Sequence, residues 1–281
     1  MNLPATVRLG FSPCPNDTFI FGALVAGEID TGGVRIEPVI EDIEALNLRA
    51  LHGELEATKI SFHAFGHIRD RYALLGAGAA LGRGCGPLVV AREPIAAETL
   101  RSGGLRIAIP GELTTAALLL RLFAPRAASF IVRPFHAIFD AVASGQADAG
   151  AIIHEGRFTF RTRGLHPVID LGEWWEGETG LPLPLGGILA RRDLGPERVR
   201  KLGLWVRRSV ETARKDPFRV WNFVRENAQE MEEAVIRAHI DLYVNEFTVD
   251  LGEEGKRAVA ALIGQAEAKG IVPRCDAPLF A

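Results

Sequence analysis

The sequence has few cysteines, which hold small secreted domains together, and it lacks the runs of basic residues that bind nucleic acids. Only three of its 281 residues are cysteines, at Cys14, Cys85 and Cys275, and they form no CxxC pair. This spacing excludes a disulfide framework and a zinc ribbon, and it favours a reducing compartment. There is no run of lysine or arginine and the formal net charge is -3, which argues against a nucleic-acid partner.

Long apolar runs are missing as well. No stretch reaches the roughly 18 apolar residues of a membrane span, and the N-terminal MNLPATVRLGFSP lacks the basic segment and apolar run of a signal peptide. We therefore expect a cytoplasmic protein with no membrane partner. With 48% hydrophobic and 24% charged residues, the composition is that of a folded protein with a sizeable core.

Strand and helix patterns alternate through the first two thirds of the chain. Apolar runs at 7–11, 34–40, 57–61 and 105–110 read as strands, and helical spacing follows at 43–51 and again from 114. This alternation predicts an α/β fold with largely parallel, helix-covered sheets. The length allows two lobes or one large α/β unit. The strand, turn and helix order of the first lobe recurs after 105, which favours two lobes with a cleft between them.

The strands at 87–92 and 183–190 are interpreted as two crossings between the lobes. Beyond 195 the chain is predicted to be almost wholly helical, with helices at 196–215, 218–228, 232–247 and 252–269 that pack on the first lobe. The predicted division is 1–88 plus 188–281 for lobe 1 and 89–187 for lobe 2.

Polar residues gather where the predicted strands end and helices begin, in segments 12–18, 59–63, 111–116 and 154–157. Such ends lie at the same edge of a parallel sheet. A helix N-terminus offers unpaired N–H groups and partial positive charge, so it binds a carboxylate without an arginine. Each residue taken alone is better explained as a simple helix cap. Four such ends from two lobes favour a site for a small carboxylate, with side-chain donors from Ser12, Asn16, Ser61, Thr114 and Thr115.

His154 directly follows an apolar strand at such an edge, in the stretch ADAGAIIHEGR. An imidazole titrates near neutral pH, so His154 is a candidate general base. A histidine that only satisfies a buried carbonyl fits this spacing equally well. Glu155 is interpreted as a first-turn acid of the next helix rather than as a partner of the imidazole. His63 and His67 are four residues apart but have no third ligand, so no metal site is predicted.

These residues also carry a resemblance to a known family. Six segments resemble, in order and over nearly the whole chain, the 1,4-dihydroxy-6-naphthoate synthases of the futalosine route to menaquinone: GFSPCPNDTF (10–19), TKIS (58–61), GRGCGPLVV (82–90), TTA (114–116), IIHE (152–155) and LPLPLG (181–186). The resemblance implies a two-lobed fold like that of type II periplasmic binding proteins, used for catalysis in the cytoplasm. It also implies a lyase that converts cyclic dehypoxanthinylfutalosinate to 1,4-dihydroxy-6-naphthoate and releases dihydroxyacetone.

The resemblance implies a role for particular residues. His154 matches the family's catalytic base, and segments 59–61 and 114–116 match its substrate-contacting segments. No metal or organic cofactor is implied, and the oligomeric state is left open, a homodimer included. Together with the residues at the helix ends, the predicted substrate-binding set is Ser12, Asn16, Lys59, Ile60, Ser61, Thr114, Thr115 and Ala116.

Two other functions stay open. The same fold serves solute capture, so a binding protein for a small carboxylate is the first alternative. The missing signal peptide weakens it. The second alternative is the related chorismate dehydratase of the same pathway, although the SPCPNDTF and IIHE segments fit the synthase better.

Overall fold

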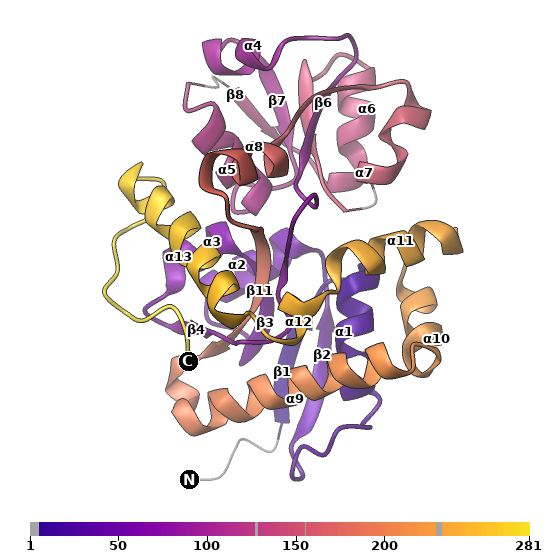
Figure 1. Cartoon of the computed structure of the whole chain (residues 1–281), viewed down its shortest axis with the longest axis vertical. Coiled ribbons are helices and arrows are strands. Elements are labelled where there is room, and N and C mark those ends of the chain that lie inside the picture. Colours follow the sequence, from indigo (N-terminus) through magenta and orange to yellow (C-terminus); the bar gives the residue numbers. More distant parts are fainter. Residues whose placement is uncertain (1–5, 127–128, 155, 229–231) are drawn as a thin grey trace.

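The computed structural model describes residues 6–126, 129–154, 156–228 and 232–281, and it contains two mixed sheets with helices packed on them (Figure 1). The first sheet has the order β2-β1-β3-β11-β4, with β5 paired to β11. Its strands are β1 (Thr6–Phe11), β2 (Arg35–Ile40), β3 (Ala57–Ser61), β4 (Tyr72–Leu74), β5 (Ala80–Gly82) and β11 (Leu183–Arg191). The second sheet has the order β10-β6-β9-β7-β8, formed by β6 (Leu88–Ala91), β7 (Arg106–Ile109), β8 (Ser129–Val132), β9 (Ala149–Ile152) and β10 (His166–Asp170).

Each sheet is built on three parallel strands. β1 pairs in parallel with β2 and β3, and β7 pairs in parallel with β8 and β9. The predicted parallel pairing is therefore present, but antiparallel strands extend each sheet. β11 lies between β3 and β4 and is antiparallel to both, and β6 is antiparallel to β9 and β10.

The interpretation of the strands at 87–92 and 183–190 as crossings was wrong. β6 is a central strand of the second sheet and β11 a central strand of the first, because their apolar side chains are buried within the sheets they join. The chain instead passes from one sheet to the other in the short segments 83–87 and 180–182. Residues 183–187 thus pair in the first sheet, whereas the predicted second lobe extends to 187. The division into lobes itself stays a prediction.

Helices cover both sheets. Around the second sheet lie the elements drawn in the upper part of Figure 1: α4 (Ala97–Ser102), α5 (Thr115–Phe123), η1 (Phe135–Ala137), α6 (Ile138–Ala143), α7 (Gly156–Thr159), η2 (Phe160–Arg163) and α8 (Leu171–Thr179). The first sheet carries α1 (Pro15–Val25), α2 (Ile43–Leu51), α3 (Phe62–Ile68), η3 (Arg192–Leu194), α9 (Pro196–Lys215), α10 (Phe218–Asn227), α11 (Glu233–Tyr243), α12 (Glu246–Val249) and α13 (Gly252–Ala268). In the part of the chain that is described, none of these helices has the length and apolar character needed to cross a membrane.

The C-terminal helices pack on the first sheet's side of the molecule, as predicted, with α9, α10 and α11 all in contact with α1. The single helix predicted at 232–247 is instead two helices. The chain breaks before α12 because Asn245 caps it: the Asn245 side chain accepts a hydrogen bond from the Phe247 N–H, and the Thr248 hydroxyl accepts one from the Asn245 N–H.

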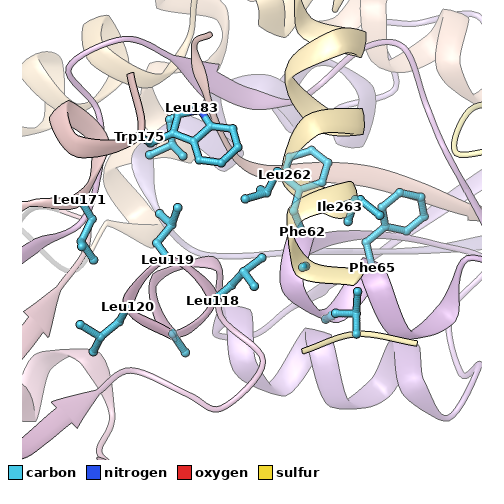
Figure 2. Packing of buried hydrophobic residues seen from close by; sticks show 14 of the residues in the cluster. Phe62, Phe65, Leu118, Leu119, Leu120, Leu171, Trp175, Leu183, Leu262 and Ile263 are labelled. Carbon is cyan, nitrogen blue, oxygen red and sulfur yellow. The ribbon is translucent and has the colours of Figure 1, made fainter. Parts of the chain in front are cut away.

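One apolar cluster joins helices from both sheets. Figure 2 shows Phe62 and Phe65 of α3 packed near Leu262 and Ile263 of α13, with Leu118 of α5 in the same cluster. Burying each such side chain fully contributes about 1.5–3 kcal/mol. The cluster therefore fixes α3 and α5 relative to each other, and with them the polar residues at their N-terminal ends.

The crossing at 83–87 contains a backbone contact that allows no side chain. A Cβ atom added to Gly86 would lie 2.3 Å from the backbone nitrogen of Gly172, at the start of α8. We expect Gly86→Ala to lower the free energy of unfolding by about 1–3 kcal/mol, because backbone atoms cannot move aside as a side chain can. Urea unfolding measures this.

A matched control lies in α8, the helix that Gly86 contacts. Gly177, inside α8, has no atom within 4 Å of an added Cβ, so Gly177→Ala should stabilise the protein by up to about 1 kcal/mol through helix propensity. Equal stability of the Gly86→Ala variant and the parent protein would contradict the close packing of the crossing.

Candidate active site

A cavity lies between the two sheets, at the ends of their parallel strands. It encloses about 670 Å³ including its open mouth. Ile60 is the predicted site residue that does not line it, because side chains alternate along β3: Lys59 and Ser61 face the cavity, and the Ile60 side chain is fully buried in the apolar core on the other face. The structure brings the other predicted residues together in the cavity wall: Ser12, Asn16, Lys59, Ser61, Thr114, Thr115, Ala116 and His154.

A buried ion pair forms one wall. Lys59 Nζ lies 2.6 Å from Asp17 Oδ1, and their side chains are only 5% and 2% exposed. Asp17 also accepts hydrogen bonds from the Ser12 N–H and hydroxyl, at 3.2 and 2.7 Å, and from Asn16 Nδ2 at 2.9 Å. The Lys59 charge is therefore balanced within the protein. Sequence reasoning missed Asp17, although it stands in the same PNDT turn as Asn16.

A second network links Ser61 to the other sheet. Asn47 of α2 accepts a hydrogen bond from the Ser61 N–H at 2.9 Å, and its Nδ2 donates to the Ser61 hydroxyl at 3.1 Å and to Glu44 Oε2 at 3.0 Å. Glu44 Oε1 accepts from the Leu113 N–H at 3.1 Å, just before α5. Burial raises the pKa of the Glu44 carboxyl. Through Glu44 and Asn47, the start of α5 and the end of β3 are held in register.

The start of α5 presents backbone donors rather than hydroxyls. Thr114 caps the helix by accepting from the Ala117 N–H, and its hydroxyl donates to the Gly111 carbonyl at 2.8 Å. The Thr115 hydroxyl donates to the carbonyl of Leu185 at 2.5 Å. Both hydroxyl hydrogens are thus used within the protein, contrary to the predicted role of these side chains as donors. The groups that α5 offers a ligand are the N–H groups of Thr115 and Ala116, since the Ala117 N–H is already bonded to the Thr114 side chain.

The backbone of His154 is strained. Among the described residues other than glycine, His154 alone has a positive φ, at 54°. A left-handed conformation costs such a residue about 1–3 kcal/mol, and strain of this kind concentrates at functional sites. The strained backbone at His154 therefore places the imidazole where an unstrained backbone conformation would not place it.

The side chains of Cys14, Phe135 and His239 lie around the His154 imidazole. Cys14 Sγ, at the N-cap of α1, lies 3.2 Å from His154 Nδ1. The ring of Phe135 meets the imidazole edge-on at 5.0 Å between centroids, and the ring of His239 is stacked on it at 6.3 Å and 11°. Glu155, interpreted above as a first-turn acid, lies outside the described residues.

α11 contributes two residues to the cavity that sequence reasoning missed, His239 and Tyr243. His239 is 1% exposed and its Nε2 lies 3.0 Å from Asn16 Oδ1. Because Asn16 Nδ2 donates to Asp17, Asn16 Oδ1 is the acceptor and His239 Nε2 the donor. Burial lowers the pKa of His239, and the nearby His154 and Lys59 lower it further, so its imidazole is neutral. His239 and Tyr243 are four positions apart in the sequence, which places both on one face of a helix. This spacing is the signal by which the sequence could have indicated them.

Cys85 lines the cavity as an inert thiol. Burial raises its pKa to about 12, so it carries almost no thiolate at neutral pH. The rings of His63 and His67 lie 5.5 Å apart. Within the described part of the chain, no group of three or more His, Cys, Asp and Glu residues is arranged to hold a metal ion.

Comparison with known proteins places these residues in a family context. Residues 7–268 match the family model described as menaquinone biosynthesis. The chain belongs to the menaquinone biosynthesis family. Two relatives are both named 1,4-dihydroxy-6-naphthoate synthase. The one from Thermus thermophilus is 53% identical over 98% of each chain, and the one from Streptomyces coelicolor is 47% identical over 95% of each. The resemblance drawn from the sequence is therefore confirmed.

The fold of this member of the menaquinone biosynthesis family is shared with solute-binding proteins. The alkanesulfonate-binding protein SsuA from Xanthomonas axonopodis pv. citri superposes with a TM-score of 0.72 at 14% identity, over 98% of this chain and 96% of that chain. At this identity the likeness concerns the fold alone. It confirms the predicted two-lobed fold of the type II periplasmic-binding-protein kind.

Proposed function

We propose that this protein is a lyase that converts cyclic dehypoxanthinylfutalosinate to 1,4-dihydroxy-6-naphthoate and releases dihydroxyacetone. The names of the two relatives support the product. The observation that carries the proposal is His154, an imidazole on strained backbone that shares one cavity with the N-terminal N–H groups of α5. A base and a set of anion-binding donors are the groups that this reaction requires.

In the proposed reaction, His154 removes a proton from the carbon beside a substrate carbonyl. The electron pair left behind opens the ring, and the carbon–carbon bond to the three-carbon unit then breaks. The protonated His154 returns its proton to this unit, which leaves as dihydroxyacetone. The ring system that remains becomes aromatic, which draws the reaction forward. The N–H groups of Thr115 and Ala116, with Ser61 beside them, hold the substrate carboxylate or the developing oxyanion.

We further propose that the protein works in the cytoplasm, with this small carboxylate as its partner. Cys14, Cys85 and Cys275 are all reduced in the structure, which suits a reducing compartment. A homodimer is compatible with this function. Light scattering of the purified protein measures the oligomeric state.

The test is incubation of metal-free purified protein with cyclic dehypoxanthinylfutalosinate, and in a parallel tube with chorismate, followed by mass-resolved chromatography. We expect 1,4-dihydroxy-6-naphthoate and dihydroxyacetone from the first tube and no change in the second. Consumption of chorismate would assign the dehydratase instead. If neither compound is consumed and one raises the melting temperature, the protein is a binding protein.

A further inference from the structure

Cys14 is a buried residue that the proposed reaction does not use. It is 6% exposed and stands between Pro13 and Pro15, whose rings fix their φ angles and so restrict the turn. Although it occupies the N-cap of α1, its side chain makes no capping hydrogen bond to that helix. The Cys14 thiol is instead 3.2 Å from His154 Nδ1.

The nature of this contact decides which nitrogen of His154 takes a proton. In a neutral imidazole one ring nitrogen carries hydrogen and the other is the base, and the hydrogen bond of one nitrogen fixes the role of the other. If His154 Nδ1–H donates to the Cys14 sulfur, Nε2 is the basic nitrogen. If the Cys14 S–H donates to Nδ1, Nε2 carries the hydrogen and cannot remove a proton. The function proposed for His154 requires the first arrangement.

The other two neighbours restrict the ring differently. Phe135 and His239 contact the imidazole through ring edges and faces, which limit its tilt. The Cys14 sulfur can accept a hydrogen bond from the imidazole, so Cys14 influences both the orientation of the His154 ring and its tautomer. This contact also joins the two sheets, because Cys14 follows β1 of the first and His154 follows β9 of the second.

We propose that Cys14 is a positioning residue for His154: its sulfur accepts a hydrogen bond from Nδ1–H and thereby leaves Nε2 as the catalytic base. The inference rests on the proposed function of His154. Because Cys14 and His154 follow strands of different sheets, Cys14 orients the His154 imidazole only when the two sheets lie as close together as in this structure.

The experiment compares Cys14→Ala with Cys14→Ser. Cys14→Ala removes the acceptor, and we expect kcat to fall about tenfold, on the scale of one hydrogen bond, with KM little changed. The limb of the kcat pH profile that reports the base should shift as well. Cys14→Ser keeps an acceptor oxygen and should recover most of kcat. Melting temperatures of both variants report any loss of packing.

A second measurement needs no turnover. Nitrogen-15 NMR of the imidazole, assigned by the signal missing from His154→Asn, reports whether Nδ1 or Nε2 carries the hydrogen. We expect Nδ1–H in the parent protein and Cys14→Ser, and a mixture in Cys14→Ala. Failure of the parent protein to convert cyclic dehypoxanthinylfutalosinate would refute the proposed function, and the NMR result would still decide the contact.

Three results would overturn the proposal. The first is an Nε2–H imidazole in the parent protein. The second is a Cys14→Ala variant with the parent's kcat and pH profile. The third is an equal loss of kcat in the alanine and serine variants together with a lower melting temperature, which would make Cys14 a packing residue only. If Cys14→Ala does not fold, the serine variant and the parent spectrum decide the question.

Discussion

Replacing His154 by asparagine or alanine is expected to lower turnover of cyclic dehypoxanthinylfutalosinate by about a hundredfold or more, the scale of a positioned general base. Neither side chain can accept the proton. Asparagine tolerates the left-handed backbone at this position better than alanine does, so a loss common to both variants cannot be ascribed to backbone strain. Product binding, measured by calorimetry, should change little, because the interaction is made in the transition state.

The matched control is His136→Ala. His136 is an exposed histidine in η1, next to Phe135, and it does not line the cavity. We expect this variant to keep the parent's kcat. Near-normal turnover by His154→Asn would remove His154 from the role of base and leave the binding-protein alternative as the one to pursue.

The second large effect is expected at the buried ion pair. Lys59→Met should lower the free energy of unfolding by about 3–5 kcal/mol, because it leaves the Asp17 carboxylate buried without its cation. Urea denaturation at neutral pH measures this loss. The double variant Lys59→Met, Asp17→Leu should recover most of the stability, since two apolar side chains replace a buried pair at little net cost.

An exposed lysine provides the control for the same chemical change. Lys201 pairs with Glu197 one turn away on α9, and the two side chains are 49% and 69% exposed. Surface pairs contribute little, so Lys201→Met should leave the unfolding curve nearly unchanged. Equal free energies of unfolding for Lys59→Met and Lys201→Met would show that the buried ion pair does not stabilise the cavity wall.

Much of the fold and site could be predicted because local signals agree with tertiary structure there. The strand at 57–61 and the helices at 43–51 and 196–215 begin and end where predicted, since apolar periodicity and end signals fix such elements locally. His154 and the α5 N-terminus were found for a similar reason. Each follows an apolar strand, and strand ends on one side of a parallel sheet must meet.

The residues that were missed depend on contacts between distant segments. Nothing near His239 shows that it will reach Asn16, which is more than two hundred positions earlier in the chain. Thr115 was predicted to donate to a ligand because its type and place allow it. Its hydroxyl is occupied only because Leu185, on a strand interpreted as a crossing, brings a carbonyl to it.

The position of β11 has a consequence for the order in which the polypeptide acquires its structure during synthesis. This strand separates β3 from β4, and its residues, Leu183–Arg191, follow all of the second sheet. The N-terminal sheet cannot be completed until they have left the ribosome, whereas every strand of the second sheet lies within residues 88–170. The middle of the chain is thus able to complete its sheet first, and the sheet that contains Lys59 is completed only afterwards.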